Sequence, residues 1–136
     1  MNKKQAYDFL TEVYQEILVA MRIEKIPYYF SKEYIQTTDG VSSNITEFTN
    51  HISALNEVVN SIFISPFYDF LFDENKQTAT LRYTVTVDKT DGNTGEIEVI
   101  AIFELSENLI FRCNELSCPL NEDEELKHLA KVNYWI

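Results

Sequence analysis

Five polar side chains in this sequence could do chemistry. They are Tyr14, Asp39, His51, Arg112 and Asn114. A histidine titrates near neutral pH, a carboxylate can accept a proton, and a tyrosine hydroxyl can donate a hydrogen bond to a substrate oxygen. Each type also has a commoner structural role, because a histidine or tyrosine beside an apolar helix face usually belongs to the core or its rim. Tyr14, Asp39 and His51 are therefore the candidates that the sequence offers for catalytic residues.

Arg112 and Asn114 share one face of a predicted strand, where an inward arginine could hold an anionic ligand. The arginine could equally pair with a carboxylate such as Asp69 or remain in solvent. If the strand register differs by one residue, Cys113 and Glu115 point inward instead. The sequence is compatible with either register of this strand.

Several other site classes are not indicated. The sequence shows no Ser-His-Asp or Cys-His arrangement, no glycine-rich phosphate loop and no cluster of metal ligands. Cys113 and Cys118 on one extended strand would lie roughly 16 Å apart, too far for a disulfide. We therefore expect no metal and no cofactor, and both cysteines as small buried or half-buried hydrophobic residues.

The elements that must position these side chains begin with helices. Asn2 and Gln5 form a capping-box pattern, and apolar residues then recur at helical spacing from Ala6 to Met21. Residues 23–30 predict a short second helix. Asn44 and Glu47 form another capping box, which opens a third helix that reaches residue 59 and carries His51 beside its apolar face.

Extended segments follow the helical ones. A brief strand is expected over residues 34–38, closed by the turn pair Asp39-Gly40. Residues 62–72 are aromatic-rich and broken by Pro66, which suggests a bulge or an edge strand. Alternating patterns then predict strands at 78–88, 95–105 and 109–117.

The strand at 97–105 has apolar residues on both faces. Val99, Ala101 and Phe103 share one face, while Ile100 and Ile102 lie on the other. Apolar residues on both sides imply that both sides are covered. Because no helices remain to cover the outer side, we expect a homodimer through the outer sheet face.

Composition limits the classes of partner. The chain has 136 residues, 45% of them hydrophobic, and a formal net charge of −11. An acidic chain without a basic stripe repels nucleic acid and anionic lipid, and no apolar run is long enough for a membrane span. We predict one domain over residues 1–136 with its core at 5–117, an acidic segment and apolar tail at 119–136 with a short helix over 123–131, and a cytoplasmic protein.

Three diffuse patterns resemble the nuclear transport factor 2-like (NTF2-like) superfamily, which includes SnoaL-like cyclases and ketosteroid isomerases. They are Ile26-Pro27-Tyr28-Tyr29-Phe30-Ser31-Lys32-Glu33, then Asp39-Gly40 leading into Glu47 and His51-Ile52, and Phe103-Glu104-Leu105 before Leu109-Ile110. The resemblance covers residues 5–117. It implies an α+β, cystatin-like cone in which three N-terminal helices pack on a strongly curved antiparallel sheet.

The ketosteroid isomerases use a tyrosine, an aspartate base and a protonated aspartic acid. An ungapped match places these groups at Tyr14, Thr38 and Ala101, with Asp39 one residue late. Because alanine cannot donate a hydrogen bond and a one-residue shift on a strand reverses the side chain, isomerase chemistry is not expected.

The sequence thus predicts a protein that binds a small, largely apolar or weakly anionic molecule in the cavity of the cone. The alternatives are a SnoaL-like cyclase or isomerase-type enzyme, and an interaction module whose cavity is filled by side chains. The expected ligand-binding residues are Tyr14, Tyr34, His51, Phe67, Tyr83, Ala101, Phe103, Arg112 and Asn114.

Overall fold

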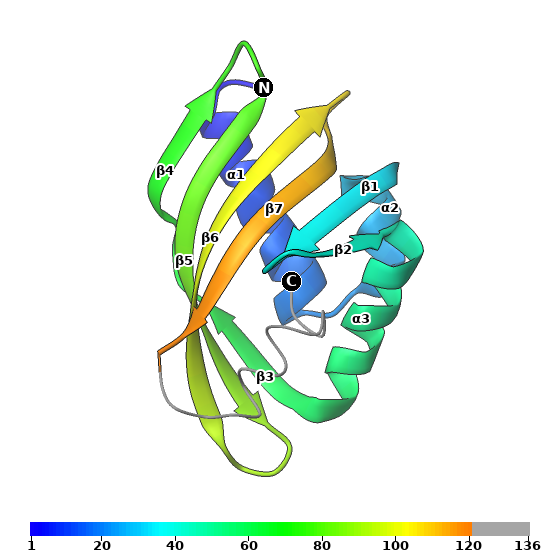
Figure 1. Ribbon diagram of the computed structural model, residues 1–136, viewed down its shortest axis with the longest axis vertical. Helices are drawn as coiled ribbons and strands as arrows, with labels where there is room; N and C mark the ends of the chain where they lie inside the picture. Colours follow the sequence, from blue (N-terminus) through cyan, green and yellow to red (C-terminus); the bar gives the residue numbers. More distant parts are fainter. Residues whose placement is uncertain (121–136) are drawn as a thin grey trace.

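The computed structural model describes residues 1–120 and places the helices on one side of a sheet (Figure 1). The helical elements are α1 (Lys3–Val13), the π-helix η1 (Tyr14–Val19), the 3-10 helix η2 (Ile23–Lys25), α2 (Ile26–Tyr29) and α3 (Ile45–Val58). Asn2 with Gln5 caps α1, and Asn44 with Glu47 caps α3, each as a capping box. Both helix starts are as predicted from the sequence.

The first helix changes its hydrogen-bonding pattern at Tyr14. The chain continues from α1 into η1 without a break, and the extra residue per turn of a π-helix shifts the side chains that follow. Tyr14, Ile17 and Leu18 are buried in this segment, while Gln15 is exposed. π-helical turns of this kind are often found at functional sites.

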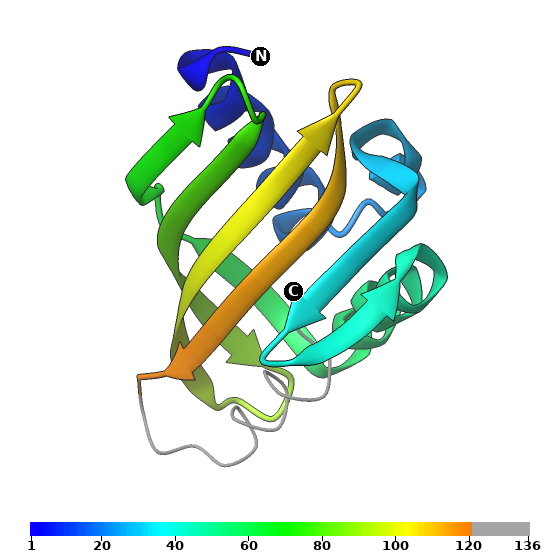
Figure 2. The same ribbon diagram turned by 45° about the horizontal axis from the view of Figure 1, so that its top comes forward.

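The strands form one sheet in the described part of the chain. They are β1 (Phe30–Thr38), β2 (Val41–Asn44), β3 (Val59–Ile64), β4 (Tyr68–Asp73), β5 (Thr78–Lys89), β6 (Thr94–Ser106) and β7 (Leu109–Pro119). Their order is β2-β1-β7-β6-β5-β3, and β4 also pairs with β5. The sheet twists around α1, as Figures 1 and 2 both show.

These elements confirm the α+β class, with corrections to individual strands. The first strand begins at Phe30, earlier than expected, and the hairpin strand β2 follows the Asp39-Gly40 turn. The region around Pro66 forms two strands, β3 and β4. β1 pairs with β7 in parallel, so the sheet is mixed instead of wholly antiparallel.

The core lies between the helices and the inner sheet face. Its largest fully buried side chains include Tyr14, Tyr34, Tyr83, Phe48 and Phe103. Along β6 the inner residues are buried, whereas Ile100 and Ile102 on the outer face are 45% and 44% exposed. The two-faced apolar pattern of this strand therefore corresponds to one core face and one open face.

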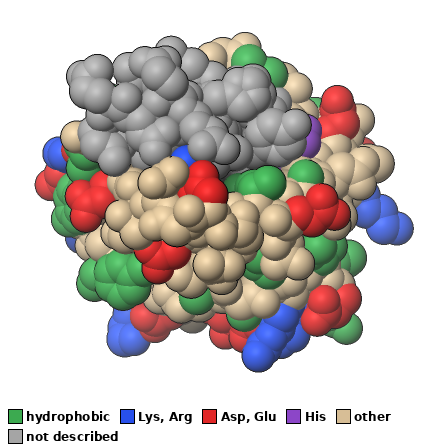
Figure 3. Space-filling view, turned by 90° about the horizontal axis from the view of Figure 1, so that it is seen from below, with side chains coloured by type: hydrophobic (Ala, Val, Ile, Leu, Met, Phe, Trp, Pro, Cys, Tyr) green, Lys and Arg blue, Asp and Glu red, His purple; other side chains and the backbone are tan. Residues whose placement is uncertain are grey.

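The predicted helix at 123–131 and the apolar end of the chain lie outside the described residues. Within residues 1–120, no helix is long and apolar enough to cross a membrane. On the face seen in Figure 3, acidic and basic side chains are interspersed, and no continuous basic patch is visible.

Candidate functional site

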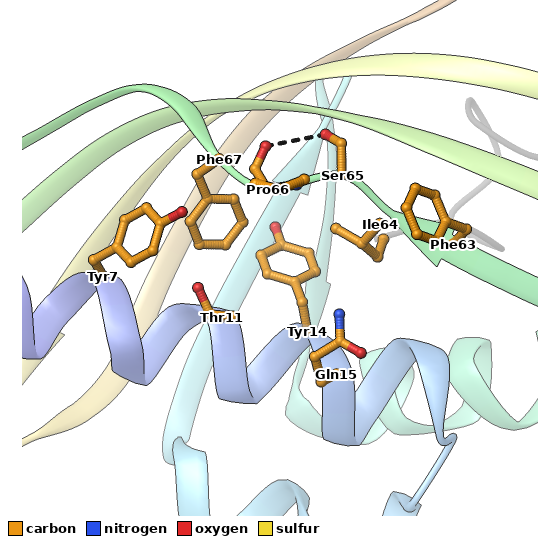
Figure 4. Close-up of a pocket in the computed structure, with 9 residues that line it drawn as sticks. All are labelled: Tyr7, Thr11, Tyr14, Gln15, Phe63, Ile64, Ser65, Pro66 and Phe67. Atoms are coloured by element: carbon orange, nitrogen blue, oxygen red, sulfur yellow. Dashed lines mark hydrogen bonds between the residues drawn. The ribbon is translucent and has the colours of Figure 1, made fainter.

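A pocket of about 370 Å³ lies between the first helix and the connection from β3 to β4 (Figure 4). Its wall is mostly apolar, with a few hydroxyl and amide groups. The helix contributes Tyr7, Thr11, Tyr14 and Gln15, and the other side contributes Phe63, Ile64, Ser65, Pro66 and Phe67. We call this cavity the Tyr14 pocket.

The β3–β4 connection owes its shape to Ser65 and Pro66. Ser65 bonds to Thr84 twice: its backbone N–H donates to the Thr84 carbonyl at 3.0 Å, and its hydroxyl accepts from the Thr84 N–H at 2.9 Å. Pro66 cannot donate a further ladder bond, so the strand is interrupted there. Phe67 then turns toward α1 and makes edge contacts with Tyr7 and Tyr14, at centroid distances of 5.5 Å and 5.6 Å.

Tyr14 links the pocket to the interior. Its ring lines the cavity, and its hydroxyl accepts a 2.8 Å hydrogen bond from the Tyr83 hydroxyl of β5. Burial raises the pKa of both hydroxyls well above the ordinary value, so both are protonated at neutral pH. Because the Tyr14 oxygen accepts from Tyr83, its own proton remains available to donate.

A second polar group lies on the inner face of β1 and β7. The Tyr34 hydroxyl donates to Gln36 Oε1 at 2.7 Å, and Gln36 Nε2 donates to Thr38 Oγ1 at 3.0 Å and to Glu115 Oε1 at 3.3 Å. The Thr38 hydroxyl donates to the same Glu115 oxygen at 2.9 Å. Four side chains from two adjacent strands thus form one buried chain of hydrogen bonds, which we call the Glu115 network.

Glu115 is a buried acid at the end of this network. Its side chain is 4% exposed, and burial raises the pKa of its carboxyl to about 8. The Thr38 hydrogen bond lowers that pKa, and the nearby Asp39 charge raises it. Its second oxygen, Oε2, is buried without a hydrogen-bond partner in residues 1–120. The carboxyl is therefore mostly protonated at neutral pH and has one unused oxygen.

The predicted ligand-binding residues lie in several different parts of the structure. Tyr14 and Phe67 line the pocket. Tyr34 belongs to the Glu115 network, and Tyr83 bonds to Tyr14. Ala101 and Phe103 are fully or almost fully buried on β6, where Phe103 makes an edge contact with Tyr14 at 6.0 Å.

Arg112 and Asn114 do not point inward. Both are exposed on the outer face, and Arg112 pairs with Glu104 at 3.3 Å instead of with Asp69. The register of β7 against β6 sets Cys113 beside Phe103 and Glu115 beside Ala101, so the alternative register is the one observed. Cys118 is exposed, whereas the sequence predicted a buried or half-buried residue.

Asp39 and His51 are also absent from the pocket lining. Asp39 accepts two hydrogen bonds from Ser117, from its N–H at 2.9 Å and from its hydroxyl at 2.5 Å. These two hydrogen bonds join the end of β1 to β7, so Asp39 has a structural role and is not a free base. His51 is partly buried on α3, and burial lowers the pKa of its imidazole.

Sequence reasoning missed several of these residues. Gln36 is the central member of the Glu115 network, and Thr11 and Ser65 line the pocket or shape its wall. One available signal was the period-two spacing of Tyr34, Gln36 and Thr38, which sets all three on one strand face. The pocket residues gave no comparable signal, because the pocket forms between segments about fifty residues apart.

The described residues offer no evident metal centre. No group of three or more His, Cys, Asp or Glu side chains within residues 1–120 could hold a metal ion. The polar groups found here instead have hydroxyl, amide and carboxyl chemistry. They suit hydrogen bonding to an organic molecule and transfer of a proton.

Comparisons with known proteins identify the fold. No family model and no curated protein matches the sequence. Among solved structures, PrhC from Penicillium brasilianum has a TM-score of 0.78 at 12% identity, covering 98% of this chain and 96% of its own. A putative polyketide cyclase from Acidithiobacillus ferrooxidans has a TM-score of 0.67 at 11% identity, covering 86% of this chain and 91% of its own.

A third similar structure is an epoxide hydrolase of the LEH-like type from M. tuberculosis, with a TM-score of 0.69 at 9% identity. It covers 85% of this chain and 84% of its own length. At these identities the likeness concerns the fold alone. The shared arrangement of helices on one face of a mixed sheet, over most of each chain, shows that this protein has the fold of the NTF2-like superfamily.

Proposed function

We propose that the protein binds a small, largely apolar molecule in the Tyr14 pocket. The observation that carries this proposal is a cavity of about 370 Å³ with a mostly apolar wall and a tyrosine hydroxyl behind it. This volume falls in the range of small-molecule sites, which combine apolar walls with a few oriented polar groups. The hydrocarbon part of the ligand would lie against Phe63 and Phe67, with its polar end toward Tyr14.

The filling of the core explains why the pocket lies at the side of the cone. Tyr14, Tyr34, Tyr83, Phe48 and Phe103 occupy the interior of the fold. A fully filled interior was the feature expected of an interaction module. The space beside Tyr14 favours ligand binding over that alternative, because it is open to solvent and apolar at the same time.

Binding can be tested with 2-ethylnaphthalene as an apolar probe, followed by fluorescence titration and native mass spectrometry. We expect saturable binding to the wild type and at least tenfold weaker binding to Thr11→Trp, whose indole would fill the pocket. Thr46→Trp is the matched control, because Thr46 is an exposed helical threonine on α3 outside the pocket. Equal binding to all three proteins would contradict the proposed site.

A second candidate function is acid–base catalysis on the bound molecule. The observation that favours it is the buried carboxyl of Glu115, whose Oε2 has no hydrogen-bond partner in residues 1–120. Burial raises the pKa of this carboxyl to about 8, which suits proton exchange near neutral pH. Tyr14, which lines the pocket, would then serve as a hydrogen-bond donor to the bound molecule. Under this hypothesis Glu115→Gln would bind the substrate and fail to turn it over, whereas a pure binding protein would show no turnover in either form.

We also propose that two copies associate through the outer sheet face. Ile100 and Leu116 are paired across β6 and β7, and they are 45% and 66% exposed. Ile102 extends this apolar area on the same face, with 44% exposure. A second copy of the chain would remove these side chains from water.

A further inference from the structure

A second cavity lies near the sheet edge opposite β4, where α2 and α3 are placed beside β1 (Figures 1 and 2). Its volume is about 410 Å³, slightly larger than that of the Tyr14 pocket, and the two cavities share no lining residue. Its apolar wall is mostly aliphatic and consists of Ile23, Ile26, Pro27, Phe30, Ile45 and Leu109. We call this cavity the Lys32 pocket, after the one basic residue among the described residues of its wall.

An irregularity in β1 shapes the polar side of this pocket. The register of β1 against β7 shifts between Phe30 and Ile35. Over this interval β1 advances by five positions, whereas β7 advances by two, from residue 110 to residue 112. Ser31 and Lys32 lie in the interval, and both line the pocket. Register shifts of this kind change the direction of side chains and are over-represented next to functional sites.

Ser31 and Lys32 both offer hydrogen-bond donors to a ligand. The Ser31 hydroxyl oxygen accepts from the Glu33 N–H at 3.1 Å, which leaves its own proton to donate. The Lys32 ammonium forms no ion pair with another residue in the range 1–120. The Thr49 hydroxyl, by contrast, already donates to the Ile45 carbonyl at 2.8 Å. A hydroxyl proton beside an ammonium group favours an acceptor that carries a negative charge.

We propose that the Lys32 pocket binds a straight-chain carboxylate, with its hydrocarbon chain against the aliphatic wall and its carboxylate at Lys32 and Ser31. The cavity volume falls in the range of small-molecule sites. A flexible alkyl chain suits a wall of isoleucine, proline and leucine side chains, whereas the aromatic wall of the Tyr14 pocket suits a flat molecule. This second site is separate from the Tyr14 pocket and does not depend on the function proposed above.

Three probes with the same alkyl chain separate the contributions of the chain and the headgroup. They are decanoate, which is anionic, 1-decanol, which is neutral, and decyltrimethylammonium, which is cationic. Isothermal titration calorimetry at pH 7.5 and low salt measures their affinities. We expect one decanoate per chain, bound about three- to fivefold more tightly than decanol because the ion pair with Lys32 is exposed to solvent, and the cation bound most weakly. High salt should remove the preference for the anion.

Two tryptophan substitutions locate the bound chain. Thr49 lines the Lys32 pocket and Thr11 lines the Tyr14 pocket, so a new indole at either position would fill one cavity and leave the other open. Thr49→Trp should weaken decanoate binding at least tenfold and leave the binding of 2-ethylnaphthalene unchanged. Thr11→Trp should do the reverse, which makes each variant the control for the other.

Substitutions of charged residues test the headgroup without filling the cavity. Lys32 is exposed, so Lys32→Gln should fold normally; it should weaken decanoate binding about three- to fivefold and leave decanol binding unchanged. Lys76→Gln is the matched control, because Lys76 is an exposed lysine in the turn between β4 and β5, outside the pocket. Glu24, the acidic residue of the described wall, acts against an anion, so Glu24→Gln should strengthen decanoate binding.

Three results would overturn the proposal. If Thr11→Trp blocks decanoate and Thr49→Trp does not, the chain lies in the Tyr14 pocket and the second site is wrong. If the wild type and Lys32→Gln bind decanoate equally well, the carboxylate is not held at Lys32. If no decyl probe binds the wild type saturably, the Lys32 pocket is not a ligand site, while the Tyr14 pocket is still judged by its own naphthalene probe.

Discussion

Ala101 and Glu115 lie opposite each other in the register of β6 and β7, on the buried face of the sheet. The methyl group of one leaves the carboxyl of the other without a competing side chain on that side. On the opposite side, Thr38 of β1 is paired with Glu115 and donates to it. The carboxyl is consequently held by one neighbour and left unobstructed by the other.

The raised pKa of Glu115 predicts that stability falls with rising pH. An acid that titrates near 4.5 when unfolded and near 8 when folded binds more protons in the folded state between these values, so the free energy of unfolding decreases across that interval. Above about pH 8 the free energy of unfolding has fallen by the full amount that a pKa shift of this size allows, roughly 3 to 5 kcal/mol. Glu115→Gln removes the ionisation and should be the more stable form at pH 9.

Urea unfolding of both proteins at pH 5, 7 and 9 checks this expectation. The difference in the free energy of unfolding between Glu115→Gln and wild type should grow from pH 5 to pH 9. Glu33→Gln, the exposed control, should follow the wild type throughout. A constant difference at all three values would show that Glu115 is charged in the folded protein.

Asp39 should stabilise the protein, because its hydrogen bonds to Ser117 join the end of β1 to β7. Asp39→Ala removes both hydrogen bonds to Ser117 and also removes a side chain suited to its positive φ of 50°. A loss of about 2 to 4 kcal/mol in the free energy of unfolding is expected. Asp39→Asn keeps a carbonyl acceptor, a donor and tolerance of that backbone conformation, so it should recover most of the loss.

The same pair of variants tests the electrostatic link to Glu115. Because the Asp39 charge raises the pKa of Glu115, both Asp39→Ala and Asp39→Asn should lower it. Titration of the Glu115 carboxyl carbon by NMR measures this directly. An unchanged midpoint in both variants would exclude Asp39 as a contributor.

The proposed dimer predicts a specific effect of charge on the outer sheet face. Leu116→Lys would set an ammonium group in the centre of the interface and should shift the protein to a monomer at micromolar concentration. Val58→Lys is the matched control, since Val58 is an exposed apolar residue on α3, on the helical side. Sedimentation velocity over a concentration series distinguishes the two, and a monomeric wild type would refute the interface.

Local sequence patterns predicted much of the fold. Capping boxes at Asn2 and Asn44 marked the two main helix starts, and alternation marked β5, β6 and β7. These signals are readable because they depend on neighbours within a few residues. The extra residues of β1, the strand β2 and the π-helical turn at Tyr14 lacked such signals.

The site depended on pairings between distant segments. Whether Arg112 or Glu115 faces the core is decided by a one-residue choice in the register of β7, and alternation along that strand is compatible with both. Pairing with β1 and β6 resolves the choice, because it joins Glu115 to Thr38 and Ala101. The sequence by itself therefore determined the two main helices, the long strands β5, β6 and β7, and their order. Only the tertiary structure decided which polar groups meet, because their hydrogen bonds join residues up to about eighty positions apart.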